Sequence, residues 1–137
     1  MKRFAVHAGD LIISCSGTMG RVAIIPNRYK EGIINQALLK LTVHNELNNM
    51  FLKILLQQPS YQRKYFSDQA GAAIQNVMSV KILKDIEIPL PTLEEQKAIV
   101  AKIEQEEQYV DACKKLIELN KQKISNKIKS IWNCDNE

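Results

Sequence analysis

The chain has 137 residues, of which 45% are hydrophobic and 25% are charged, and its formal net charge is +4. This length suits one domain with an extension, and the hydrophobic content excludes a disordered chain. No apolar run approaches the roughly 20 residues that cross a bilayer, and the three scattered cysteines suit neither a disulfide framework nor a zinc site, so we expect a cytoplasmic protein without a membrane partner.

The chain divides at Pro89 and Pro91 into two parts of different composition. Residues 1–91 contain all five glycines and all four prolines, and they carry eleven Lys and Arg against six Asp and Glu. Residues 92–137 contain neither Gly nor Pro and carry eight basic against nine acidic residues. The excess of positive charge therefore lies on the first part, as phosphate binding requires, although an ordinary solvated surface produces the same count.

The first part is predicted to combine short strands with helices, which makes the fold class α+β. Apolar runs at 11–15 and 21–25 flank a Gly-rich turn and predict a β-hairpin or β-arch. Apolar positions with helical spacing predict a helix from about Glu46 to Gln57 that packs on a sheet. The other expected features are apolar runs at 33–34 and 37–43 around Asn35-Gln36, a short helix from Pro59 to about Phe66, a polar loop at 68–76 and a short strand at 86–88.

One long helix is predicted in the second part. Thr92-Leu93-Glu94-Glu95 has the pattern of a capping box, in which the Thr hydroxyl and the Glu carboxylate each bond the other residue's backbone N–H. No Gly or Pro interrupts the sequence from there to about Ile131. A helix of about 40 residues is roughly 60 Å long.

This long helix carries an apolar seam. Branched apolar residues recur at seven-residue intervals, like the a positions of a heptad, whereas most d positions are polar. Such a helix makes a weak coiled coil with itself but a workable one with a partner. A domain of about ninety residues cannot cover a helix of this length, so we expect something outside the domain to cover the seam. The seam residues are Ile99, Ile103, Val110, Ile117, Ile124 and Ile131.

Charge is graded along the same helix. Residues 92–111 carry six acidic and two basic side chains, and residues 112–131 carry one acidic and six basic side chains. Two copies packed antiparallel would place acidic halves against basic halves, whereas a parallel pair would place like charges together. The helix dipole favours the same order of charges but acts only over the first and last turns. We therefore expect a homodimer formed through antiparallel helices.

Three segments resemble, in the same order, the specificity subunits of type I restriction–modification systems. They are 9–21 (GDLIISCSGTMGR), 32–39 (GIINQALL) and the junction 83–103, which contains IPLPTLEEQ. The junction is similar to the end of a target recognition domain and the start of the spacer helix. The resemblance implies that residues 1–91 are the C-terminal part of such a domain, that residues 92–132 are the spacer and dimerisation helix, and that residues 133–137 are a tail.

The resemblance also implies a function. A recognition domain of this family reads one half of a bipartite double-stranded DNA target without catalysis. Paired helices act as a ruler between the halves and dock the methyltransferase (M) subunits and, through them, the restriction (R) subunit. Family members carry two recognition domains and two helices, so we expect this chain to be either a half-subunit whose dimer rebuilds the whole or a fragment. The alternative is an assembly module that pairs or docks without binding DNA independently.

Polar and basic residues of the first part are candidates for DNA contact. Hydroxyls in the Gly-rich turn suit phosphate, and the arginine after it suits phosphate or a guanine edge; an ordinary turn explains the same residues. Asn and Gln amides suit adenine, although those between apolar runs equally suit a structural role. Arg28, Arg63 and Lys64 are further phosphate candidates. The predicted DNA-binding residues are Ser16, Thr18, Arg21, Lys30, Asn35, Gln36, Gln75, Asn76 and Lys81.

Catalytic interpretations of the sequence are weak. Cys15 with His7 or His44 would need a base and an orienting group brought together, and Cys15 lies in an apolar run typical of a buried, inert thiol. We find no methyltransferase motif of the Asn-Pro-Pro-Tyr type, no Walker A loop and no nuclease-like cluster. We therefore expect no enzymatic activity, no cofactor and no metal.

Overall fold

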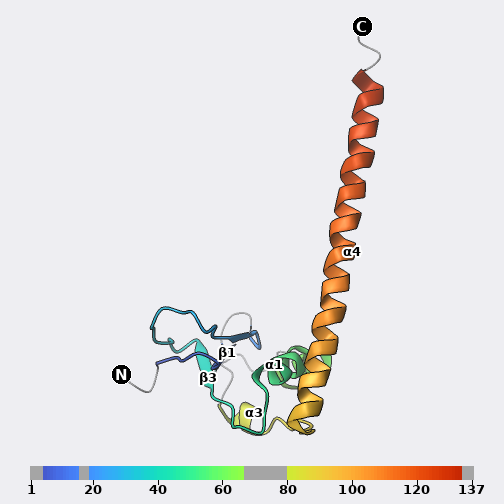
Figure 1. Ribbon diagram of the computed structural model, residues 1–137. Helices are drawn as coiled ribbons and strands as arrows, with labels where there is room; N and C mark the ends of the chain where they lie inside the picture. Colours follow the sequence, from blue (N-terminus) through green and yellow to red (C-terminus); the bar gives the residue numbers. More distant parts are fainter. Residues whose placement is uncertain (1–4, 16–18, 67–79, 134–137) are drawn as a thin grey trace. The chain divides into compact units, whose positions relative to one another are not determined.

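The computed structural model of the chain describes residues 5–15, 19–66 and 80–133. Within these residues it has a three-stranded antiparallel sheet, short helices and one long helix, so the predicted α+β class is confirmed (Figure 1). The chain separates into two compact units, Met1–Val100 and Ala101–Glu137. The predicted polar loop at 68–76 lies outside the described residues.

The sheet is built around β1 (Leu11–Ser14), which pairs with β2 (Val22–Ile24) on one side and β3 (Leu38–Leu41) on the other. Leu11 lies opposite Ile24 in one pairing and opposite Leu41 in the other. The predicted hairpin is therefore confirmed, as β1 and β2. The earlier apolar run at 33–34 forms only an isolated bridge between Ile33 and Ala5.

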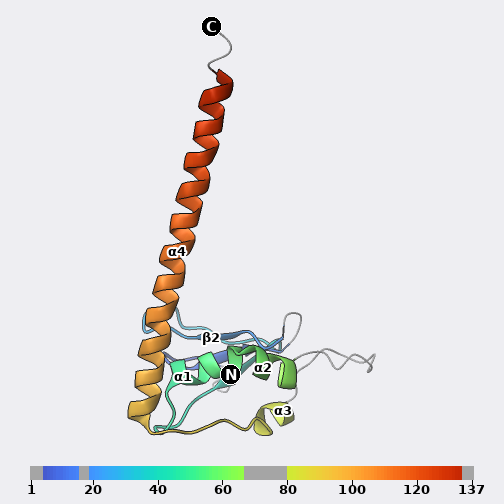
Figure 2. The same ribbon diagram turned by 90° about the vertical axis from the view of Figure 1, so that its right-hand side faces the viewer.

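The core of the first unit lies between one face of the sheet and the helix α1 (Asn49–Gln57), which lies beside β2 (Figure 2). Alternate residues of the β1 segment point into this core, as the two-residue period of a strand requires: Leu11, Ile13 and Cys15 are all at most 1% exposed. The other buried members of this core are Val22, Leu52, Leu56 and Phe66.

The helix α1 begins three residues later than the sequence predicted, because Asn48 caps it. Asn48 has an extended backbone, and its side-chain oxygen accepts hydrogen bonds from the N–H groups of Met50 and Phe51. The helix α2 (Pro59–Tyr61) and the π-helical turn η2 (Gln62–Phe66) follow, which confirms the predicted short helix.

The predicted strand at 86–88 is wrong. The helix α3 (Val80–Lys84) precedes this segment, and residues 86–88 have an irregular backbone. Ile86 and Ile88 pack against the core, which accounts for the alternating pattern that predicted a strand. Burial of alternate side chains does not by itself make a strand, because a strand also needs backbone hydrogen bonds to a neighbouring strand. The Glu87 carbonyl instead accepts a hydrogen bond from the Tyr61 hydroxyl (3.1 Å).

The helix α4 (Leu93–Asn133) has 41 residues and begins with the predicted capping box. The Thr92 N–H and hydroxyl donate to the Glu95 carboxylate (2.9 and 2.8 Å), and the Glu95 N–H donates to the Thr92 hydroxyl (3.3 Å). These bonds lower the pKa of the Glu95 carboxyl, because they favour its charged form. The cap therefore fixes where α4 starts.

Gln96, in the first turn of α4, is fully buried and bonds three backbone groups. Its side-chain nitrogen donates to the carbonyls of Glu46 (2.9 Å) and Pro91 (2.8 Å), and its side-chain oxygen accepts from the Asn48 N–H (2.7 Å). One amide thereby joins the start of α4 to the residue that caps α1. A buried amide is tolerated in a core only when it is hydrogen-bonded in this way.

Among the described residues of the first unit, Asp10 is the acidic residue that is buried, and it is 4% exposed. It accepts hydrogen bonds from the His7 N–H and the Thr42 hydroxyl, both 2.8 Å, and the Lys40 ammonium lies 3.8 Å away. Burial acts to raise the pKa of this carboxyl, but the two hydrogen bonds and the Lys40 charge outweigh it. The pKa therefore lies below its ordinary value of 3.8.

We predict that Gln96→Ala lowers the free energy of unfolding of the first unit by about 2–4 kcal/mol, because it leaves three backbone groups without their partner. Urea titration followed by circular dichroism measures this change. The matched control is Gln105→Ala in the same helix, where the side chain is exposed and bonds only the Tyr109 hydroxyl, and its expected cost is below about 0.5 kcal/mol. Equal costs for the two variants would contradict the prediction.

We also predict that Asp10→Asn destabilises the chain by about 1–3 kcal/mol at pH 7 and by progressively less as the pH falls below 3.8. A carboxylate with a depressed pKa contributes stability above its unfolded pKa and loses it as the pH falls through the folded pKa. Urea titrations of both proteins between pH 7 and pH 3 give the difference. Asp111→Asn, at an exposed carboxylate, serves as control and should cost little at any pH. A cost of Asp10→Asn that does not shrink in acid would refute the prediction.

Candidate nucleic-acid interface and helix seam

The end of β1 brings two groups of predicted DNA-binding residues together. Ser14 pairs with Arg21 through two hydrogen bonds, in which the Ser14 N–H donates to the Arg21 carbonyl and the Arg21 N–H donates to the Ser14 hydroxyl (both 3.0 Å). On the other side, the Cys15 N–H donates to the Ala37 carbonyl (2.8 Å). Arg21 and the Asn35-Gln36 pair therefore flank the same end of the central strand, and all three residues are exposed.

The described candidates differ in how their side chains are used. The Asn35 side-chain oxygen accepts a hydrogen bond from the Ala37 N–H (3.0 Å). The sequence suited Asn35 either to base contact or to a structural role, and this hydrogen bond is a structural one. Gln36 and Lys30 are exposed in the connection between β2 and β3. Lys81 lies in α3, with its side chain outside the described part. Ser16, Thr18, Gln75 and Asn76 lie outside the described residues.

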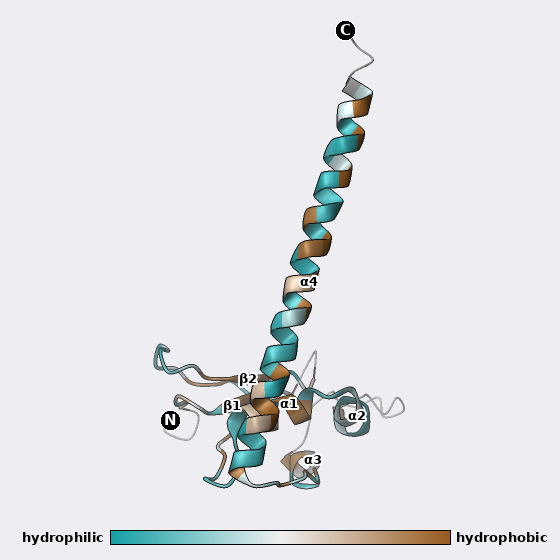
Figure 3. Ribbon diagram, turned by 45° about the vertical axis from the view of Figure 1, so that its right-hand side comes forward, coloured by the Kyte–Doolittle hydropathy of each residue, from teal (hydrophilic) through white to brown (hydrophobic). Residues whose placement is uncertain are grey.

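The seam of α4 is exposed along the second unit. Its side chains are partly buried at Ile103 and then more than half exposed at each later position, and apolar residues recur along the helix in Figure 3. The exposed fractions are 51% for Val110, 56% for Ile117, 61% for Ile124 and 59% for Ile131. Within residues 101–133, each of these side chains therefore keeps most of its apolar surface in water.

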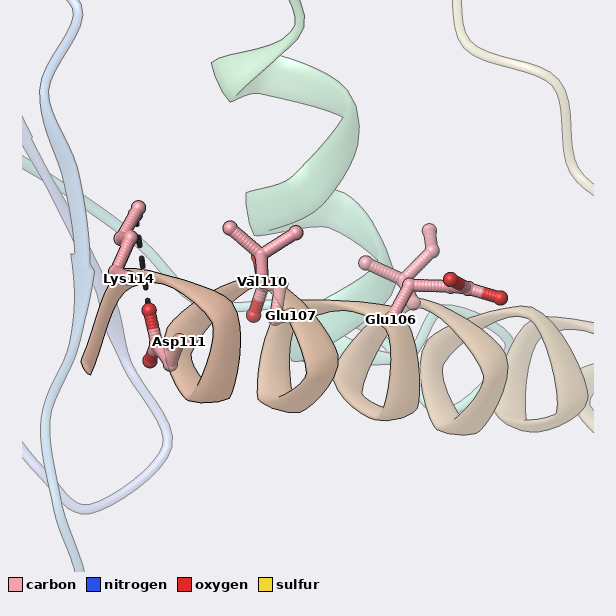
Figure 4. Close-up of a pocket in the computed structure, with 6 residues that line it drawn as sticks. Glu106, Glu107, Val110, Asp111 and Lys114 are labelled. Atoms are coloured by element: carbon pink, nitrogen blue, oxygen red, sulfur yellow. Dashed lines mark ion pairs between the residues drawn. The ribbon is translucent and has the colours of Figure 1, made fainter. Parts of the chain in front are cut away.

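Acidic side chains flank the first part of this seam. Ile103 and Val110 line a shallow hollow on α4 together with Glu106 and Glu107. Figure 4 shows Val110 beside the two glutamates, and Lys114 lies 3.7 Å from the Asp111 carboxylate, with both of these side chains exposed. A lining of apolar and acidic side chains suits a partner helix that presents apolar and basic side chains together.

Comparison with known proteins decides the family. Residues 1–130 match the model of the type I restriction modification DNA specificity domain. The chain belongs to this family.

Individual relatives agree with the family match. The chain is 27% identical over 130 residues to the type I restriction enzyme EcoBI specificity subunit of Escherichia coli, covering 95% of this chain and 27% of that protein. It is 31% identical over 121 residues to a putative type I restriction enzyme MjaX specificity subunit of Methanocaldococcus jannaschii, covering 85% of this chain and 27% of the relative. The chain thus spans about a quarter of the length of each.

A solved structure supports the fold of this specificity-family chain. A chain from a study titled "Structural basis underlying complex assembly and conformational transition of the type I R-M system" superposes with a TM-score of 0.64 at 29% identity. The match covers 82% of this chain and 26% of the solved one. The arrangement of small sheet, short helices and long helix is therefore shared with a component of such a system.

Cys15 is 1% exposed, and burial raises the pKa of its thiol, so the predicted buried thiol is confirmed. Among the described residues, no cluster of three or more His, Cys, Asp or Glu side chains is arranged to hold a metal ion. The described helices also include none that is both long and apolar enough to cross a membrane.

Two tyrosines that sequence analysis passed over lie close together near the end of β1. The rings of Tyr61 and Tyr65 are 5.8 Å apart between centroids, and the Lys64 ammonium lies 4.9 Å from the centroid of the Tyr65 ring. The signal was present as Tyr-Gln-Arg-Lys-Tyr at 61–65, where two aromatic residues enclose two cations. Gln96 lies in the junction segment 83–103, but its three hydrogen bonds could not be inferred from the sequence because two of the partner residues are about fifty positions away.

Proposed function

We propose that this chain is the DNA-sequence-recognition element of a type I restriction–modification system and has no catalytic role of its own. The observation that supports this most is that one family match spans the α+β unit and the long helix in a single stretch, residues 1–130. The net positive charge of residues 1–91 suits a phosphate-rich partner. In this proposal residues 1–91 read half of a bipartite target and residues 92–132 form the spacer helix, with 133–137 as a tail.

The proposed contacts with DNA gather at the end of β1. Arg21 is exposed there, and its planar guanidinium has the paired donors that bond phosphate or the O6 and N7 atoms of guanine. Gln36 is exposed on the other side of the end of β1 and suits adenine, whereas the Asn35 oxygen is held by the Ala37 N–H. The remaining proposed contacts are Ser16, Thr18, Lys30, Gln75, Asn76 and Lys81.

The helix α4 is proposed to pair with the helix of a second copy in antiparallel orientation and to dock the M subunits, with the R subunit reached through them. The exposed seam supplies the apolar surface, and a reversal of charge along the helix, from six acidic and two basic residues at 92–111 to one acidic and six basic at 112–131, supplies the orientation. The competing proposal is an assembly module that uses the same seam without binding DNA independently.

We predict that the chain selects a specific sequence from a random duplex-DNA library at moderate salt. If its helices pair as proposed, the enriched sequence will be a palindrome whose halves are separated by a fixed, unspecified gap. Sequencing of the retained duplexes is the measurement, and Arg21→Ala should relax the preference at one position in each half. No retention at all would favour the assembly module instead, and retention of DNA without any enrichment would contradict sequence recognition.

We predict that the chain sediments as a dimer and that Ile117→Asp, at the middle of the seam, makes it a monomer with unchanged helix content. Because Ile117 is 56% exposed in the single chain, the aspartate that replaces it would be buried only when two helices pair. The matched control is Gln122→Asp, five residues further along α4 and on the side of the helix away from the seam, which should leave the dimer intact.

Orientation is tested with mixed chains that each carry one added cysteine in a Cys113→Ser, Cys134→Ser background, where the remaining Cys15 is buried. Chains with Ile103→Cys should form a disulfide with chains that carry Ile131→Cys, and neither should link efficiently to itself. Preferential linking of residue 103 to residue 103 would refute the antiparallel pair.

A further inference from the structure

The turn η2 is fixed to the rest of its unit by two residues that point inward. The Gln62 side-chain nitrogen donates to the carbonyls of Gly20 (3.0 Å) and Leu56 (2.6 Å), and Phe66 is 6% exposed. Gly20 has a φ of +75°, and a Cβ there would lie 2.8 Å from both the Gln62 side-chain oxygen and the Phe66 ring. Only glycine fits this contact, so η2 is seated firmly on the turn that precedes β2.

The outer side of η2 presents aromatic and cationic groups. The Tyr61 hydroxyl is held by the Glu87 carbonyl, and the Tyr65 ring lies between the Tyr61 ring and the Lys64 ammonium. Arg63 and Lys64 are exposed, and the contact of Lys64 with the Tyr65 hydroxyl raises the pKa of its ammonium. We call Tyr61, Arg63, Lys64 and Tyr65 the η2 surface.

The form of the η2 surface favours a polyanion over a small molecule or an unstacked base. The hollow beside it, lined by Ser60, Tyr61, Lys64, Tyr65 and Glu87, has a volume of 180 Å³, below the roughly 300–1,000 Å³ of ligand pockets. The tyrosines are half-buried and pack against each other, which leaves little ring face for a base to stack on. Glu87 contributes one carboxylate at the edge, against two cations on the surface.

The η2 surface also lies near the proposed base-reading residues. Gln62 bonds the carbonyl of Gly20, and the next residue in the chain is Arg21 at the end of β1. A duplex that presents its base edges to Arg21 and Gln36 therefore runs its backbone close to η2. Contacts to phosphate position a protein on a duplex and add affinity without reading sequence.

We propose that the η2 surface binds the sugar–phosphate backbone of duplex DNA beside the bases read at the end of β1. This inference rests on the proposed function. Lys64 has three N–H donors, more than its contact with Tyr65 uses, and Arg63 adds a second cation one residue away. The Tyr65 ring supports the Lys64 ammonium, so that it is held in place before DNA arrives.

The test measures binding of the full chain to its selected duplex and to a scrambled duplex by fluorescence anisotropy across a salt series. We expect Lys64→Ala to weaken binding about fivefold on both duplexes and to reduce the slope of log K against log salt by about one. Lys64→Arg should restore both. The matched control is Lys97→Ala. Lys97 is the residue after Gln96, which bonds Asn48 at the start of α1, whereas η2 follows the other end of α1. The Lys97→Ala variant should therefore match the wild type in affinity and salt slope.

The outcomes separate this inference from the function on which it rests. A wild-type chain that binds neither duplex overturns the proposed function itself. A wild-type chain that binds while Lys64→Ala matches it in affinity and salt slope overturns only the role of the η2 surface. A loss on the selected duplex alone would also overturn it, because a phosphate contact cannot distinguish sequences.

Discussion

The side-chain amide of Gln96 holds the first unit together at the point where its helices meet. It bonds the Glu46 and Pro91 carbonyls and the Asn48 N–H, and Asn48 in turn caps α1. Because the amide is fully buried, every one of these bonds must form or its polar atoms would lose their solvation without compensation. The start of α4 is thereby bonded to the segment that begins and caps α1, the helix that covers the sheet.

The sheet is small, yet its central strand gathers distant parts of the chain at one end. Arg21 and Asn35-Gln36 lie on either side of the end of β1, and Gly20 allows η2 to approach the same turn. A DNA-reading surface needs groups that identify bases beside groups that hold the backbone. In the proposed function these two roles belong to different segments that the sheet places side by side, with Gln36 and Arg21 reading and Lys64 holding.

The long helix has a different physical character. From Val110 onward its seam residues are more than half exposed at seven-residue intervals, so they are available to pack against another helix. The chain belongs to the type I specificity family and spans about a quarter of the length of its curated relatives. A graded charge along one face is a simple means of fixing orientation, because it makes the two directions of pairing unequal in energy.

The features that the sequence alone determined are local or strictly periodic. The Thr92–Glu95 capping box, the seven-residue seam and the β1–β2 hairpin each depend on residues close in the chain, and all three occur in the structure. The predicted strand at 86–88 failed because alternation records which side chains are buried and not which backbone groups pair. Only the tertiary structure decided the bonds from Gln96 to Glu46 and Asn48 and the seating of η2 on Gly20, because each joins residues more than forty positions apart.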